Sequence, residues 1–138
     1  MSKPTVLTTV TAAPLDRAMQ REFVGRPAAG AIVTFEGVIR DNDQGRGVIG
    51  LRYEAHPSAS AVLDVIADRY RDTVLAVAVE HRIGELAIGE IALLCTVAAT
   101  HRIEAFQICA DLVDTVKAEL PIWKHQRFTD GSTEWVGL

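Results

Sequence analysis

The sequence predicts an α+β fold in which two long helices pack on a mainly antiparallel sheet. Several segments of strand length are rich in apolar and β-branched residues and end at glycine, proline or polar residues. Two longer segments instead repeat apolar residues at i, i+3 and i+4, the spacing of one helix face. The length of 138 residues, 49% hydrophobic and 23% charged, fits one domain spanning residues 1–138.

The first part of the chain is expected to contain two strands with a short helix between them. Residues 4–12 are rich in β-branched side chains, which favours a strand. Pro14 opens a short helical stretch that stops at Gly25. Residues 28–40 then form a buried strand, with a bulge expected at Gly37.

The middle of the chain is predicted to form a loop, a strand and a long helix. Residues 41–47 are polar and contain two glycines, which is typical of a mobile loop. Residues 48–55 alternate in character, and this predicts a strand with one buried face. Residues 58–74 have helical periodicity. The expected buried residues are Ile49, Leu51 and Tyr53 on the strand, and Val62, Ile66 and Tyr70 on the helix.

The last part of the chain is predicted to contain the second long helix between two pairs of strands. The first pair is placed at 75–83 and 90–99, joined by a connection at 84–89. A helix over 101–119 ends before Pro121, because the residue before a proline is pushed out of the helical region. Its buried face is expected to hold Phe106, Cys109, Val113, Val116 and Leu120. The final strands lie at 122–128 and 133–136.

The composition of the chain limits the kinds of partner that the protein is expected to have and the cellular compartment in which it is expected to work. A formal net charge of −4 gives no reason to expect nucleic-acid binding, so any anion site must be a local basic cluster. Cys95 and Cys109 stand far apart among apolar residues, as buried free thiols do in a reducing cytosol. No signal peptide or membrane-spanning run is visible. The sequence therefore predicts a soluble, cytoplasmic protein with no membrane or nucleic-acid partner.

The lysines are the first candidate for chemistry. The chain has eleven arginines and only three lysines, and two of these, Lys117 and Lys124, lie on either side of Pro121. A lysine amine can lose its proton in a desolvated pocket or act as a nucleophile, whereas arginine stays charged. The alternative is that both are solvated surface lysines, with Lys117 paired to Asp114 at little energetic gain.

Further basic residues gather at the predicted ends of elements. His101 and Arg102 begin the second long helix, where basic groups oppose the helix dipole unless an anion binds there. Alternatively, Arg102 simply pairs with Glu104 or another carboxylate. The other members of the predicted basic cluster are Arg40, Arg46, Lys117, Lys124, His125 and Arg127.

Other kinds of site find little support. The four histidines are scattered and the cysteines have no ligand spacing, so no metal site is predicted. The segment Gly45-Arg46-Gly47 is too short for a phosphate-binding loop. Trp123 lies between the two lysines and is expected in the core rather than stacked on a ligand.

Four segments stand in the order in which they occur in a known family. They are Gly30–Asp41, His81–Glu90, Thr100–Phe106 and Lys117–Lys124. Over residues 28–137 the chain resembles the large, catalytic subunit of molybdopterin synthase. The resemblance implies an α/β-hammerhead fold and a central homodimer within a heterotetramer.

The resemblance also implies a reaction and its partners. A small ubiquitin-like sulfur carrier would thread its C-terminal Gly-Gly thiocarboxylate into the active site. Two sulfur atoms would pass to cyclic pyranopterin monophosphate and form the dithiolene of molybdopterin, without a metal or other cofactor. Because sulfur arrives on the carrier, no reactive cysteine is needed, and a phosphorylated substrate accounts for a basic cluster on an acidic protein.

Particular residues inherit roles from the matching motifs. Lys117 would be the central catalytic lysine, and Lys124 would assist in substrate binding and proton transfer. Arg40, His101 and Arg102 would bind the phosphate and pterin groups. The pocket would be lined further by Val38, Ile39, His125 and Gln126.

The chain departs from the family pattern at several positions. Val38 stands where relatives often carry lysine, and His125-Gln126 where they commonly show Arg-Glu. Arg46 or Arg127 would have to replace basic residues that relatives carry beyond the position of Leu138. Two other readings remain open: a module that binds a phosphorylated ligand or ubiquitin-like partner without catalysis, and a lysine enzyme that forms a Schiff base with a carbonyl substrate.

Overall fold

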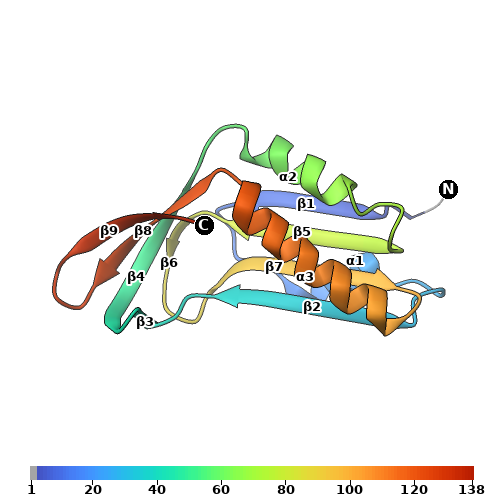
Figure 1. The fold of residues 1–138 in the computed structure, drawn as a ribbon, viewed down its shortest axis with the longest axis horizontal. Coiled ribbons are helices and arrows are strands. Elements are labelled where there is room, and N and C mark those ends of the chain that lie inside the picture. The colour runs from blue at the N-terminus through green and yellow to red at the C-terminus, as the bar shows by residue number, and fades with distance from the viewer. Residues whose placement is uncertain (1–2) are drawn as a thin grey trace.

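The protein consists of two β-sheets joined end to end, with helices on both faces of the larger sheet (Figure 1). The structure is a computed structural model that describes residues 3–138. The helices are α1 (Arg17–Val24), α2 (Ala59–Asp68) and α3 (Arg102–Glu119). The strands are β1 (Val6–Thr11), β2 (Ala31–Val38), β3 (Asn42–Asp43), β4 (Arg46–Ala55), β5 (Ala76–Arg82), β6 (Gly84–Leu86), β7 (Ile91–Ala99), β8 (Ile122–Phe128) and β9 (Thr133–Gly137).

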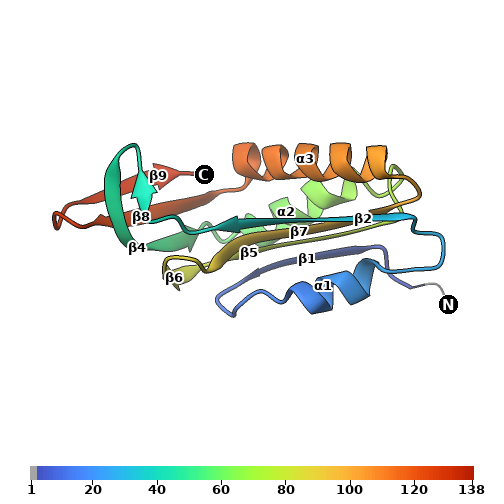
Figure 2. The same ribbon diagram turned by 90° about the horizontal axis from the view of Figure 1, so that it is seen from below.

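The larger sheet has the strand order β1-β5-β7-β2, with β1 parallel to β5 and the other neighbours antiparallel. Helices α2 and α3 cover one face, and α1 lies on the opposite face (Figure 2). The second sheet has the order β3-β4-β8-β9, and β6 also pairs with β4. The predicted α+β class with a mainly antiparallel sheet is confirmed, although α1 adds a helix on the far side of the predicted two-helix layer.

The main core lies between the larger sheet and helices α2 and α3 and continues into the second sheet. Cys95 and Cys109 are buried in it as free thiols, as predicted. Leu51 and Tyr53 of β4 belong to the same cluster as Leu112 of α3, so one core joins both sheets. The site described below lies at this junction.

Three aromatic or aliphatic side chains predicted to be buried face outward. Phe106 is 61% exposed, because α3 turns Cys109 and Val113 toward the sheet and leaves Phe106 beside the edge strand β2. Ile49 is 57% exposed, since the pairing of β4 with β8 shifts register at this residue. Trp123 is 45% exposed because strand alternation turns its neighbours inward instead.

Three segments are more regular or shorter than predicted. The expected loop at 41–47 is a tight hairpin between β3 and β4, in which Gln44 and Gly45 both have positive φ. The expected connection at 84–89 contains β6. Helix α2 ends at Asp68 rather than at 74, and the next residues form turns with i to i+3 hydrogen bonds.

The bulge predicted at Gly37 is present as a register shift between Gly37 and Val38.

No helix among residues 3–138 has both the length and the apolar character needed to cross a membrane.

Candidate functional site

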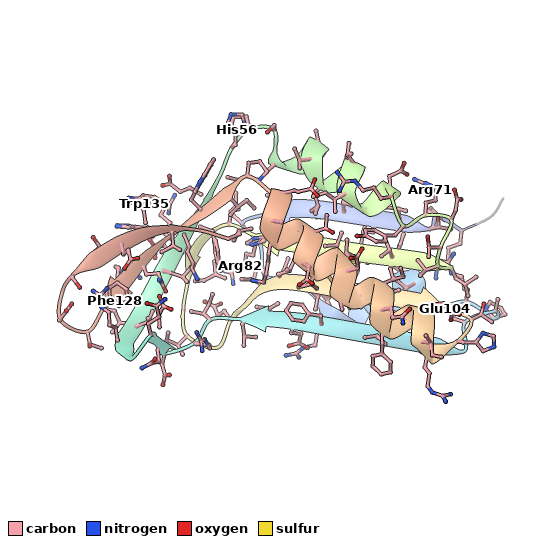
Figure 3. All side chains as sticks on the ribbon, viewed as in Figure 1. His56, Arg71, Arg82, Glu104, Phe128 and Trp135 are labelled. Atoms are coloured by element: carbon pink, nitrogen blue, oxygen red, sulfur yellow. The ribbon has the colours of Figure 1, made fainter. Side chains whose placement is uncertain are left out.

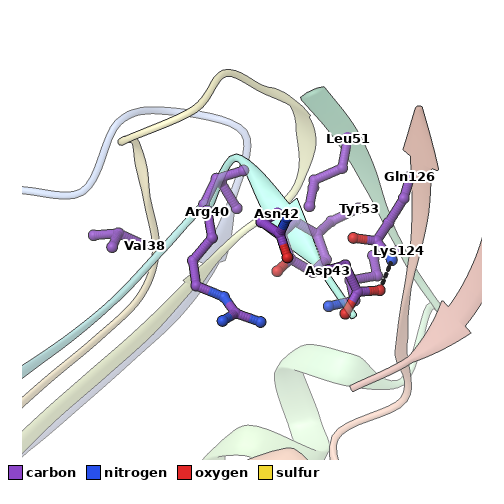
Figure 4. Close-up of a pocket in the computed structure, with 9 residues that line it drawn as sticks. Val38, Arg40, Asn42, Asp43, Leu51, Tyr53, Lys124 and Gln126 are labelled. Carbon is purple, nitrogen blue, oxygen red and sulfur yellow. Dashed lines mark hydrogen bonds between the residues drawn. The ribbon is translucent and has the colours of Figure 1, made fainter. Parts of the chain in front are cut away.

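A polar pocket lies where the end of β2 meets the second sheet (Figure 4). Five predicted site residues line it together: Val38, Ile39, Arg40, Lys124 and Gln126. The remaining lining residues are Asn42, Asp43, Leu51 and Tyr53. The pocket is therefore built from two distant parts of the chain, the β2–β4 region and β8.

Arg40 reaches the pocket because the segment after β2 is held against a turn. The backbone N–H of Ile39 donates to the carbonyl oxygen of Glu90 at 3.1 Å, and the N–H of Gly89 donates back to the Ile39 carbonyl at 2.8 Å. Ile39 is buried, whereas the next residue, Arg40, is exposed. The guanidinium is thus available to an anion while its backbone is fixed.

The pairing of β4 with β8 sets the opposite wall. Tyr53 lies opposite Lys124, and Leu51 lies opposite Gln126. Directly paired side chains stand on the same face of a sheet, with Cβ atoms about 4.5–5.5 Å apart. The Gln126 side-chain amide donates to Oδ2 of Asp43 at 2.9 Å, which links this wall to β3 (Figure 4). Gln126 and Asp43 are thereby held in one orientation.

The Lys124 amine lies in an electrostatic setting that favours loss of its proton. Burial lowers the pKa of Lys124, and the nearby charges of Lys117 and Arg40 lower it further, while Asp43 opposes the change. Lysine responds readily to such surroundings, whereas arginine does not. The pocket thus contains a fixed cation, Arg40, beside an amine that can act as a proton carrier.

Lys117 lies in the last turn of α3 and is not among the residues that line this pocket. Its side chain is exposed, and its charge acts on both Lys124 and the buried His81. No ion pair joins it to Asp114 within the described part of the chain. Because the charges of Lys117 and Arg40 both act on Lys124, the structure brings the two lysines and Arg40 into one region, as predicted.

His101 and Arg102 do not share this region within one chain. They stand at the start of α3, whereas Lys117 lies in its last turn. Because an α-helix rises about 1.5 Å per residue, the distance from Arg102 to Lys117 along the helix axis is about 22 Å. The expectation that His101 shares a cleft with both lysines of the same chain is wrong. His101 instead lines a different pocket, together with residues 72–75. Within residues 3–138 no ion pair joins Arg102 to Glu104 or to another carboxylate. Glu104, labelled in Figure 3, has one carboxylate oxygen, Oε2, that is buried without a hydrogen-bond partner.

His125 also lies away from the pocket. Adjacent strand residues point to opposite faces, so Lys124 faces the pocket and His125 the outer side of β8. There its ring stacks on Trp135 with centroids 4.5 Å apart. The prediction that His125 lines the pocket is wrong for this reason.

The two arginines considered as substitutes for missing basic residues already have acidic partners. Arg46 bonds to Glu134 at 3.1 Å and lies over the ring of Phe128. Arg127 bonds to Glu85 at 2.8 Å. Neither lines the pocket.

Two residues next to the lysines were not singled out in the sequence. Tyr53 lines the pocket, and burial raises the pKa of its hydroxyl to about 12. His81 is 2% exposed and its ring meets that of Tyr53 edge-on, with centroids 4.9 Å apart. The Nδ1–H of His81 donates to the carbonyl oxygen of Arg82 at 2.7 Å. Burial lowers the pKa of His81 to about 4, and the charge of Lys117 acts in the same direction.

The arrangement suits an anionic substrate and proton transfer. Arg40 and the lysines supply positive charge and hydrogen-bond donors for a phosphate or carboxylate. Within residues 3–138 no three histidine, cysteine, aspartate or glutamate side chains gather in a way that would hold a metal ion. The chemistry available from these side chains is thus charge stabilisation, acid–base transfer and attack by an amine.

Comparison with known proteins gives a consistent result. The family model described as MoaE protein matches residues 10–119. A molybdopterin synthase catalytic subunit from Nostoc sp. is 37% identical over 133 residues, covering 94% of this chain and 81% of the relative. One from Arabidopsis thaliana is 41% identical over 113 residues, covering 80% of this chain but only 57% of the longer plant protein.

The solved structures agree with the sequences. The crystal structure of molybdopterin synthase from Staphylococcus aureus matches with a TM-score of 0.84 and 30% identity, covering 100% of this chain and 99% of that chain. The resemblance carried by the four sequence segments is therefore confirmed. The chain belongs to the MoaE family, the family of the molybdopterin synthase catalytic subunits.

Proposed function

We propose that this chain, as the catalytic subunit of a molybdopterin synthase, transfers sulfur to cyclic pyranopterin monophosphate. The sulfur donor is the thiocarboxylated C-terminus of a small ubiquitin-like carrier, and the product is the dithiolene of molybdopterin. The observation that carries the proposal is the half-buried Lys124 amine in a pocket with Arg40, beside Lys117. Relatives that are molybdopterin synthase catalytic subunits support the reaction class. Because those relatives are subunits of an enzyme, they also support a partner protein.

The two lysines divide the work according to their exposure. Lys117 is exposed outside the pocket lining and its charge acts on Lys124, so we take it as the amine that an incoming carrier tail meets first. Lys124 lies inside, where burial and the charges of Lys117 and Arg40 favour its neutral form. Arg40 holds the phosphate, and Lys124 exchanges protons with the substrate as sulfur is added. Val38, Ile39 and Gln126 shape the walls of the same pocket.

A second copy of the chain would supply His101 and Arg102. An apolar groove between β2 and α3 is lined by Val33, Phe35 and the exposed Phe106, and β2 is an edge strand. If the edge strand β2 lies antiparallel to the β2 of a second copy, with the two-fold axis across the strands, the two α3 helices also run in opposite directions. The start of each helix then approaches the end of the other. The His101–Arg102 pair of one protomer would thereby reach the lysines of its partner.

We propose in addition a domain organisation and a cellular compartment for the protein. We take residues 1–138 as one domain because a single core cluster joins both sheets. The free, buried thiols of Cys95 and Cys109 suit a reducing compartment, and we place the protein in the cytoplasm.

The deciding assay mixes the protein with thiocarboxylated carrier and cyclic pyranopterin monophosphate and measures dithiolene formation. Formation of product, with loss of turnover in Lys117→Ala, supports the proposal. Absence of product, when a known synthase subunit succeeds with the same reagents, rejects it. Retained pterin or carrier binding without turnover would identify a non-catalytic binding module. Trapping of a pterin adduct on Lys117 by borohydride would instead indicate Schiff-base chemistry.

A further inference from the structure

Tyr53 is a pocket residue that the proposed lysine chemistry leaves unused. It lies opposite Lys124 in the β4–β8 ladder, and both side chains line the same pocket (Figure 4). The residue is 8% exposed, so its ring is packed in the core while the hydroxyl is the polar atom it brings to the pocket wall. No other residue among 3–138 forms a hydrogen bond with that hydroxyl.

The Tyr53 hydroxyl has no protein partner, yet it is not sealed in the core, because among residues 3–138 the fully buried side-chain polar atom that lacks a partner is Oε2 of Glu104. Burying a polar group without a hydrogen bond costs about 1–3 kcal/mol, and tyrosine hydroxyls usually find a partner when buried. Tyr70 illustrates the usual case: it is 7% exposed, and its hydroxyl donates to Asp111 at 2.6 Å. The unpaired hydroxyl of Tyr53 instead remains accessible on a residue that lines the pocket where the substrate is expected.

His81 holds the Tyr53 ring from behind. The two rings meet edge-on at 4.9 Å and 80°, an arrangement that favours one orientation of each. His81 is itself fixed, because its Nδ1–H donates to the carbonyl oxygen of Arg82. The hydroxyl is thus carried by a ring that is packed on one side and aimed at the pocket on the other.

We infer that Tyr53 is a catalytic residue whose hydroxyl donates a hydrogen bond to the oxyanion formed on the carrier's terminal carbonyl, with His81 as its positioning residue. This inference rests on the proposed sulfur transfer. Burial keeps the pKa of the Tyr53 hydroxyl near 12, so the group stays protonated as a donor at neutral pH. A donor held in a water-poor site is a strong means of stabilising developing negative charge.

The step that needs this donor is cleavage of the carrier's carbon–sulfur bond. Once the sulfur has bonded to a pterin carbon, the carrier is attached through a thioester. Water attacks the carbonyl carbon, a carbon–oxygen bond forms, and the carbonyl electron pair moves to oxygen. Collapse of this oxyanion expels sulfur with its bonding pair, leaving a thiolate on the pterin and a carboxylate on the carrier. One water proton passes to the Lys124 amine, whose deprotonated form is favoured by burial and by the charges of Lys117 and Arg40, and the other passes to solvent.

The test is Tyr53→Phe, which keeps the ring and removes one oxygen atom. Loss of a hydrogen bond to a charged group should lower kcat on the order of 10- to 100-fold, while KM for cyclic pyranopterin monophosphate stays close to that of the unmodified protein. Tyr70→Phe is the matched control, since it removes the hydroxyl of another largely buried tyrosine that does not line the pocket, and it should leave kcat unchanged. An unchanged kcat in Tyr53→Phe, an equal loss in Tyr70→Phe, or a change in KM alone would overturn the inference.

The positioning role of His81 has a separate readout. His81→Gln keeps a donor for the Arg82 carbonyl but removes the ring that meets Tyr53. It should lower kcat in the unmodified protein and have no further effect in Tyr53→Phe, because coupled residues are not additive. Additive losses would show that His81 acts only through general stability. If the unmodified protein forms no product, the proposed sulfur transfer is rejected. If the unmodified protein forms product and Tyr53→Phe has the same kcat, only the proposed role of Tyr53 is rejected.

Discussion

Burial lowers the pKa of Lys124 and the positive charge of Lys117 lowers it further, although the two lysines lie seven positions apart in the chain with Pro121 between them. Pro121 ends α3 and directs the chain into β8, so the last helical turn and the new strand face the same region. The two amines therefore form one electrostatic unit with Arg40. Their contribution to sulfur transfer can be separated by variants that keep charge and variants that remove it.

Lys124→Arg should abolish most activity while retaining the charge of the site. Arginine remains protonated, so it can hold an anion but cannot act as the proton carrier. We expect kcat to fall by about 100-fold or more, the usual contribution of general acid–base catalysis, with a smaller change in KM for the pterin. Steady-state kinetics check this. A kcat close to that of the unmodified protein would show that Lys124 acts only as a charge.

The pKa of Lys124 should move in opposite directions in two variants. Lys117→Gln removes a repelling positive charge and should raise it, whereas Asp43→Asn removes an attracting negative charge and should lower it. The chain has only three lysines, so the ¹³Cε signals of labelled protein can be assigned with Lys3→Gln as control. Shifts in the same direction in both variants would contradict this electrostatic account.

Local sequence patterns were sufficient for most of the architecture. Apolar periodicity located α3, and Pro121 marked its end. Periodicity cannot tell, however, whether a helix lies at the middle or the edge of a sheet. For this reason the prediction that Phe106 is buried is wrong. A register shift, such as the one that turns Ile49 outward, depends on the partner strand and leaves no local signal.

The candidate site was predictable only where residue type carried the signal. Lys117, Lys124 and Arg40 stood out because basic residues at the ends of elements need a reason. Tyr53 and His81 had no such signal, since both fit a buried strand and only the pairing of β4 with β8 brings Tyr53 to Lys124. The prediction that His125 lines the pocket together with Lys124 conflicts with a local rule, because adjacent residues of a strand point to opposite faces of the sheet.

His81 should make the fold sensitive to mild acid. Its pKa is about 4 when folded and about 6.5 in the unfolded chain, so below 6.5 the unfolded state binds a proton that the folded state does not. Stability is therefore fully present above pH 6.5 and falls as the pH drops toward 4, by about 3 kcal/mol in total. Urea unfolding at several pH values measures this. His81→Gln cannot titrate and should lose that part of the pH dependence; an unchanged dependence would show that other groups cause it.

Phe106→Glu should break the proposed self-association. Phe106 is 61% exposed at an apolar groove, and a carboxylate there would have to be buried without a partner in a symmetric interface. We expect the variant to be a folded monomer with low activity, while Ile88→Glu, at a surface residue outside the groove, should leave the dimer intact. Light scattering after size-exclusion chromatography measures the mass. Equal dimer content in both variants would place the interface elsewhere.

Mixed dimers test whether the site is shared between protomers. Lys117→Ala and Arg102→Ala should each be inactive alone. If each site combines Lys117 of one chain with Arg102 of the other, a mixed dimer has one intact site and one site lacking both residues. Random exchange of equal amounts makes half of the dimers mixed, so activity should recover to about a quarter of the unmodified value. If both residues act within one chain, each protomer carries one defect and mixing restores nothing.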